Sequence, residues 1–176
     1  MPERKARERR DMTTVENPYE KVRRKMVAAR IEFLGELAKF NKNDVEKWPA
    51  EGEWSPLKLA NHLYIADGLA LEQLKQVQNE NNPLVVPSEE EAPRLTNAAE
   101  PPVSLNAVLG GMAARREEIF EYLSTLPADA WERPFRHPAW GQLKFYQMVN
   151  ILPFHDQMHA KQLSAIREGL LVEKNH

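Results

Sequence analysis

Two histidines near the C-terminus, His155 and His159, stand four residues apart in the segment HDQMH. Side chains at positions i and i+4 of an α-helix lie one above the other on the same face, so two imidazole rings at this spacing can reach a common point. Neutral imidazole binds zinc, nickel, copper and iron. If this segment is helical, the spacing therefore indicates two ligands of one divalent metal ion.

A third ligand has to come from another helix, because a catalytic metal site commonly has three protein ligands and one open position. His62 is the candidate, since it lies on the inner stripe of an expected helix, whereas His137 falls in an expected loop and His176 is the last residue. The alternative is that these are core histidines, each hydrogen-bonded to a carboxylate or carbonyl, which is the usual role of a lone buried imidazole. The set of three favours the metal, provided that the two helices lie side by side.

Four amphipathic segments are expected to position these histidines. They cover residues 18–40, 56–79, 105–126 and 143–168, and in each of them apolar residues recur at the spacing of three and four that marks one helix face. Ser55 followed by Pro56, and Ser104, are helix-start signals, while Gly169 is a candidate cap at the end of the last helix. No run of alternating β-branched residues lies between the segments. The expected fold class is therefore all-α, a four-helix bundle.

Prolines separate the expected helices. The segment 81–103 contains five of the thirteen prolines and an acidic run at 89–91, which predicts a long crossover loop between the second and third helices that could act as a lid. Residues 127–141 read as a second loop. Pro153 lies within the fourth helix and removes one backbone hydrogen bond, so we expect a bend or break there, or a helix that begins later.

Composition predicts one globular domain at residues 17–170, between a flexible basic tail at 1–16 and a short tail at 171–176. The net charge of −2 gives no bulk attraction to nucleic acid or to a membrane surface. No segment has the roughly 20 consecutive apolar residues of a membrane span, and no secretion signal is recognisable, so we expect a cytoplasmic protein. Cysteine is absent, which leaves histidine, carboxylate and carbonyl groups as possible metal ligands.

Several other residues near the histidines could take part. Asp67 is a candidate hydrogen-bond partner for a ligand, whereas Asp156 is expected to be a surface charge or a partner for a neighbouring helix. Arg116 is expected at the solvated edge of the third helix, with contact to an anionic substrate as the alternative. Aromatic residues that could either line a cleft or simply pack are Trp54, Tyr64 and Trp140.

Two stretches of the chain resemble a known family. The phrase EWSPLKLANHLYIADG, with Trp54 and Ser55 followed by His62, and the phrases WGQLKF and HDQMHAKQL near the C-terminus resemble the DinB/YfiT-like metal-binding four-helix bundles. The similarity covers residues 17–169. It implies a three-histidine site at His62, His155 and His159 that holds a divalent ion, most often zinc or nickel, with open positions that face a cleft, commonly in a homodimer.

The resemblance also suggests the kind of reaction. Characterised relatives include thiol-dependent S-transferases that use low-molecular-weight thiols, and many members have no known activity. We therefore expect a metal-dependent enzyme acting on a small molecule, with thiol transfer to an electrophile first and metal-assisted hydrolysis second; catalytic residues are unknown. The alternative functions are a non-catalytic metal-binding protein and a metal-free bundle that binds a protein partner. The long proline-rich loop and Pro153 depart from the family pattern, and these departures concern the shape of the substrate pocket rather than the ligands.

Overall fold

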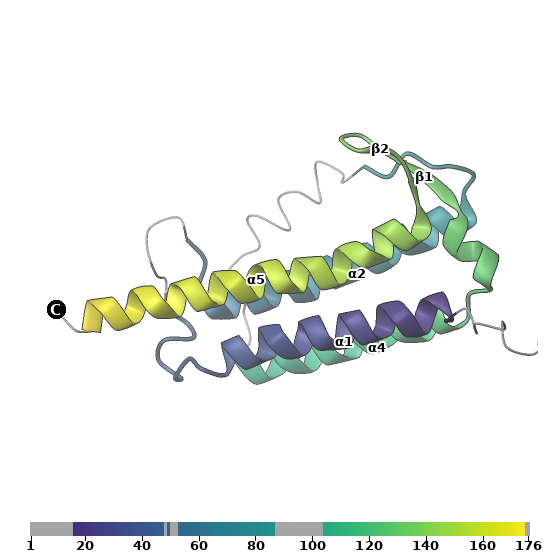
Figure 1. Cartoon of the computed structure of the whole chain (residues 1–176). Helices are drawn as coiled ribbons and strands as arrows, with labels where there is room; N and C mark the ends of the chain where they lie inside the picture. The colour runs from purple at the N-terminus through teal and green to yellow at the C-terminus, as the bar shows by residue number, and fades with distance from the viewer. Residues whose placement is uncertain (1–15, 48, 50–52, 87–103, 175–176) are drawn as a thin grey trace, which may run out of the picture.

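The computed structural model of the chain describes residues 16–47, 49, 53–86 and 104–174. Four long helices run alongside one another: α1 (Pro18–Leu37), α2 (Pro56–Asn79), α4 (Leu105–Ser124) and α5 (Phe145–Lys174). In Figure 1, α2 and α4 run in one direction, and α1 and α5 run in the other. This is a four-helix bundle, as the sequence predicts. None of the described helices is both long enough and apolar enough to cross a membrane.

The helix starts follow from local side-chain chemistry. Oδ1 of Asn17 accepts a hydrogen bond from the backbone N–H of Tyr19, and Pro18 occupies the first turn of α1. Ser55 and Ser104 cap α2 and α4 in the same way, each through its hydroxyl oxygen and a backbone N–H three residues later. These caps satisfy backbone donors that have no partner within the helix.

Helix α5 is longer than predicted. It continues through Pro153 without a break and past Gly169 to Lys174, so the predicted C-cap is wrong. Packing explains both differences: Leu152 and Leu163 are buried on either side of Pro153, and Leu170 is buried beyond Gly169. Lys174 also donates to Oδ2 of Asp44 at 2.6 Å, which fixes the last turn against the rest of the chain.

The predicted loop at 127–141 contains regular structure that the sequence reading missed. A 3₁₀ helix, η1 (Ala128–Glu132), leads into a hairpin of β1 (Pro134–His137) and β2 (Gly141–Lys144), which pair antiparallel with Phe135 opposite Leu143. Gly141 has a φ of +72°, which suits a glycine in the tight connection. The strands are too short to give a period-two pattern, which is why the sequence did not reveal them.

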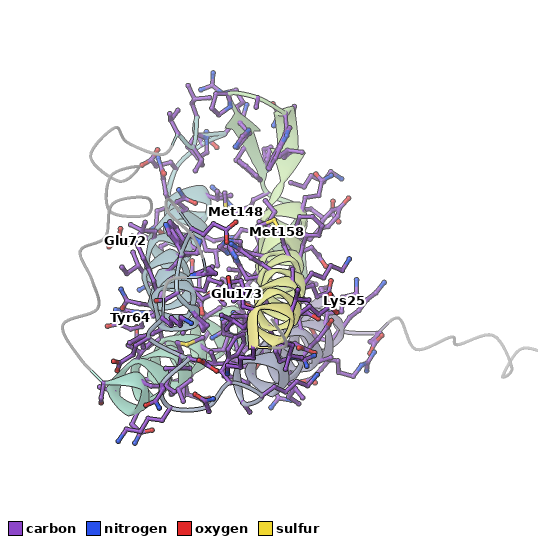
Figure 2. The ribbon with its side chains drawn as sticks, turned by 90° about the vertical axis from the view of Figure 1, so that its left-hand side faces the viewer. Lys25, Tyr64, Glu72, Met148, Met158 and Glu173 are labelled. Carbon is purple, nitrogen blue, oxygen red and sulfur yellow. The ribbon has the colours of Figure 1, made fainter. Side chains whose placement is uncertain are left out.

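Two apolar clusters form the core, one toward each end of the bundle. The first includes Met26, Leu74, Ile119 and Phe145, and the second includes Phe33, Leu63, Met112 and Leu163. Along every helix the clusters are separated by one buried charged position, and these positions are Arg30, Asp67, Arg116 and Asp156. The view along the bundle axis in Figure 2 shows the four helices around this shared interior.

Predictions for residues 1–15, for most of the 81–103 loop and for His176 lie outside the described residues.

Candidate metal centre

The structure brings together the three histidines that the sequence singles out. His62 lies on α2, and His155 and His159 lie one turn apart on α5. Nε2 of His155 is 3.1 Å from Nε2 of His62 and 2.9 Å from Nε2 of His159. A potential ligand atom from each ring lies within 4.8 Å of the other two. The assumption that the second and last helices are adjacent is therefore correct.

These distances fit a shared metal ion better than they fit hydrogen bonds among the rings. One imidazole nitrogen carries either a proton or a lone pair, so Nε2 of His155 cannot form two well-directed hydrogen bonds to its two neighbours. Two nitrogens that each lie about 2.0–2.1 Å from one ion are separated by about 2.9–3.4 Å, depending on the coordination angle. The observed separations fall in this range.

Burial favours the neutral form of the two histidines on α5. Desolvation, together with the nearby His159, lowers the pKa of His155 to about 4, and burial also lowers the pKa of His159. A neutral imidazole keeps the lone pair that a metal requires. His155 and His159 can therefore bind a cation at neutral pH without first losing protons.

Two contacts hold the ligand rings in place. Nδ1 of His159 is 2.8 Å from Oε1 of Gln162, one turn along α5. In the tautomer that leaves the Nε2 lone pair available, Nδ1–H donates to this oxygen, so Gln162 fixes both the tautomer and the ring orientation. The Trp54 ring packs against His62 at a centroid distance of 4.9 Å, and the Lys58 ammonium lies over Trp54.

A cleft of about 640 Å³ opens beside His159. Its walls include Glu53, Trp54, Gln162 and Ile166, so of the two roles open to Trp54, lining a cleft and packing, the structure shows both. Within the described part of the chain, no fourth histidine or carboxylate joins the cluster of three. A small molecule in this cleft would therefore approach the side of the site formed by His159.

Three charged residues occupy positions other than those expected. Asp156 is 1% exposed and Arg116 is 5% exposed, so both surface placements are wrong, although Asp156 does bind neighbouring helices. Asp67 accepts hydrogen bonds from Arg116 and Arg30 rather than from a histidine. It affects the ligands through its charge, which acts to raise the pKa of His155 against the larger effect of burial.

Arg30, which the sequence reading missed, completes a buried ionic centre with these three residues. Each helix contributes one member, and six hydrogen bonds of 2.9–3.1 Å join the two guanidinium groups to the two carboxylates. Burial alone would lower the pKa of Arg30, but Asp67 and Asp156 outweigh it and raise the pKa. A signal was present, because Arg30 lies on the apolar stripe of α1, four residues after Met26.

Two aromatic candidates do not contribute to the histidine cluster. Tyr64, which is labelled in Figure 2, packs toward α4. Its ring lies next to Gly111 and beneath the Arg115 guanidinium. Trp140 is 61% exposed in the hairpin connection, where its ring stacks on His137 at 4.2 Å. His137 therefore has a local structural role, since its Nδ1 also accepts hydrogen bonds from the backbone N–H groups of Ala139 and Trp140.

Comparison with known proteins supports both the fold and the family. The chain is 24% identical over 153 residues to the uncharacterized protein YuaE of Bacillus subtilis, covering 81% of this chain and 94% of that protein. Its fold matches that of YfiT from Bacillus subtilis, described as a probable metal-dependent hydrolase with an unusual four-helix bundle topology. The TM-score is 0.70 at 14% identity, over 86% of this chain and 87% of YfiT.

A second solved structure, the four-helix bundle protein TT2238, matches with a TM-score of 0.59 at 21% identity, over 84% of this chain and 98% of that one. The model of the DinB superfamily matches residues 25–163, which span most of α1, all of α2 and α4 and most of α5, with all three histidines. The chain therefore belongs to the DinB superfamily.

Proposed function

We propose that this protein is a metal-dependent enzyme that uses one divalent ion, zinc or nickel, to activate a nucleophile against a small electrophilic substrate. The observation that carries the proposal is the convergence of three imidazole Nε2 atoms with separations of 3.1 and 2.9 Å around His155. Three neutral ligands leave the full charge of the ion available, and a three-ligand set leaves room for substrate or solvent.

The ion would lower the pKa of a bound water or thiol and so supply a nucleophile near neutral pH. The chain's own residues do the positioning. Gln162 holds the His159 ring through Nδ1, and Trp54 packs against His62 at one wall of the cleft. A substrate in the cleft of about 640 Å³ would thus meet a rigid ligand set.

Two nucleophiles are consistent with this centre. Water would make the protein a hydrolase, and the description of YfiT as a probable metal-dependent hydrolase supports this reading. A small thiol would make it an S-transferase, in which case the thiol must be a cosubstrate because the chain has no cysteine. The alternative, a non-catalytic metal-binding bundle, is less favoured because structural zinc sites normally have four protein ligands.

The first test is metal analysis of the purified, untagged protein beside a His155→Ala/His159→Ala variant and a His137→Ala control. We expect about one equivalent of a transition metal in the wild type and in the control, and almost none in the double variant. Circular dichroism establishes that each variant is folded. A wild type that takes up no metal even after incubation with zinc and nickel would refute the proposal.

The second test separates the two reactions. The metal-loaded and chelator-treated proteins are assayed for hydrolysis of activated esters and for transfer of a small thiol, such as cysteine, to an alkylating electrophile. Activity in one assay that disappears with the chelator and with the double histidine variant assigns the nucleophile. Full metal loading with no activity in either assay would favour the non-catalytic alternative.

We also propose that the protein is a homodimer. Apolar side chains of Ile151, Phe154 and Met158 are 38%, 65% and 46% exposed on one side of α5, which supports a contact with a second copy. Light scattering should give twice the chain mass of 20.3 kDa, and Phe154→Glu should shift it to a monomer, whereas Gln157→Glu should not. A monomeric wild type would rule the dimer out.

A further inference from the structure

A second cavity lies between α1 and α4, apart from the histidines. Its volume is about 490 Å³, within the range of pockets that hold small organic ligands. Apolar side chains form most of its walls, including Leu34, Phe40, Leu109 and Phe120. The three histidines lie on α2 and α5 and do not line this cavity, so it is distinct from the candidate metal centre.

Among the described residues, the charged groups that line the cavity are Arg30, Arg116 and Glu117. Arg116 uses Nε and Nη2 to bind the two buried aspartates, but no acceptor within the described residues bonds to its buried Nη1 atom. A buried donor without a partner is costly, so it is rarely kept without a reason. Arg116, which lines the apolar cavity, therefore has one unused hydrogen-bond donor, and this donor is buried.

The charge balance decides which acceptor suits this donor. The two arginines and two aspartates of the ionic centre cancel, so a bound anion would meet no net positive charge there. Burying an uncompensated charge in an apolar cavity is strongly unfavourable, and Glu117 in the wall would repel an anion further. A neutral acceptor, such as a carbonyl oxygen, avoids both costs.

We propose that the cavity between α1 and α4 is a binding site for a small, mainly apolar molecule with one neutral hydrogen-bond acceptor. A small shift of the Arg116 side chain brings its Nη1 donor to this acceptor. The apolar body of the ligand packs against Leu34, Leu109 and Phe120. The site does not depend on the metal, because none of its lining residues is a metal-ligand candidate.

The test is a titration of the full, metal-loaded chain with 2-octanone and with octanoate at pH 7.5, followed by two-dimensional ¹H–¹⁵N NMR. The two probes share an apolar body and differ in the charge of the acceptor. We expect saturable shifts confined to α1, α4 and the Arg116 guanidinium signal with the ketone. Octanoate should bind at least about tenfold more weakly than the ketone, because its charge is not compensated in the cavity.

Two neighbouring alanines on α4 provide a matched pair of variants. Ala113 lines the cavity and Ala114 does not, and both side chains are exposed. Ala113→Phe fills the cavity and should weaken ketone binding by about tenfold or more, whereas Ala114→Phe should leave it unchanged. If Ala113→Phe does not fold, Leu109→Trp serves the same purpose.

The proposal is overturned if the ketone shows no saturable binding, if cavity-filling and control variants lose binding equally, or if octanoate binds more tightly than the ketone. None of these outcomes bears on the metal, because the shifts are read at α1 and α4. The proposed enzyme function is therefore tested independently of this binding site.

Discussion

The bundle interior contains two polar centres with opposite designs. The histidine centre has three rings from two helices, whose Nε2 atoms converge beside an open cleft. The ionic centre has four charged side chains, one from each helix, joined by six mutual hydrogen bonds. The first is arranged to receive a further group, and the second is nearly complete in itself.

The difference assigns different roles to neighbouring residues. His155 and Asp156 are adjacent on α5, yet one faces the cluster of rings and the other binds Arg30 and Arg116. Three imidazole nitrogens that converge in this way are suited to binding a further group. A closed set of charges instead fixes how the four helices pack, because each charge is tolerated in the interior only while its partners are present.

The largest expected effect comes from opening the ionic centre. Asp156→Ala leaves Arg30 and Arg116 partly unpaired in the interior and should reduce the free energy of unfolding by roughly 3–5 kcal/mol. Chemical denaturation of the metal-free protein measures this, with Gln157→Ala on the exposed side of α5 as the control. A loss below about 1 kcal/mol, typical of exposed ion pairs, would mean that the centre is far more hydrated than its burial indicates.

The histidine centre should make the free energy of unfolding depend on pH. The pKa of His155 is lowered to about 4 in the folded protein, compared with about 6.5 when unfolded. Its contribution is therefore present above pH 6.5 and is lost as the pH falls toward 4, since the unfolded chain takes up the proton first.

The shift corresponds to at most about 3 kcal/mol. Denaturation of metal-free wild type and His155→Ala between pH 4 and 8 measures it. The variant should show a shallower fall over this range, and parallel curves for the two proteins would contradict the assignment to His155.

A smaller effect is expected from removing the contact between Gln162 and His159. Gln162→Leu removes the acceptor for Nδ1–H of His159 but keeps the ligands, so metal affinity should fall by about 10- to 100-fold. Competition with a chelator gives the affinity, and Gln157→Leu on the same helix is the control. Equal affinity in wild type and Gln162→Leu would show that Gln162 does not orient the ring.

The smallest net effect is expected when the ionic centre is replaced as a unit. Changing Arg30 and Arg116 to Met, and Asp67 and Asp156 to Leu, removes every buried charge together, which in other proteins is close to neutral or stabilising. Thermal unfolding should therefore show a much smaller loss than Asp156→Ala alone. A loss larger than that of the single variant would mean that the pairing itself, rather than the avoidance of unpaired charge, stabilises the bundle.

Sequence periodicity predicted the four helices and the set of three histidines. His155 and His159 are adjacent because four residues make about one helical turn, whatever the rest of the fold does. Capping by Ser55 and Ser104 is equally local, which is why the starts of α2 and α4 were predicted correctly.

The predictions that were wrong concerned features that depend on contacts between distant segments of the chain. The hairpin at residues 134–144 has four-residue strands, too short for a pattern, and α5 passes Gly169 because Leu170 is buried. Arg116 was expected at a solvated edge, and Asp156 either at the surface or as a partner for a neighbouring helix, of which only the second is correct. Only when the four helices assemble does each charge find oppositely charged partners on two other helices.

The sequence by itself thus determined the helices, the histidine pair on one face of the last helix and the absence of thiolate ligands. The tertiary structure decided that His62 meets that pair, that four charges meet in the interior, and that cavities open beside His159 and between α1 and α4. The physical reason is the range of the interactions. Helix periodicity and capping act within a few residues, whereas pairing charges and enclosing a cavity require segments that meet only in the folded chain.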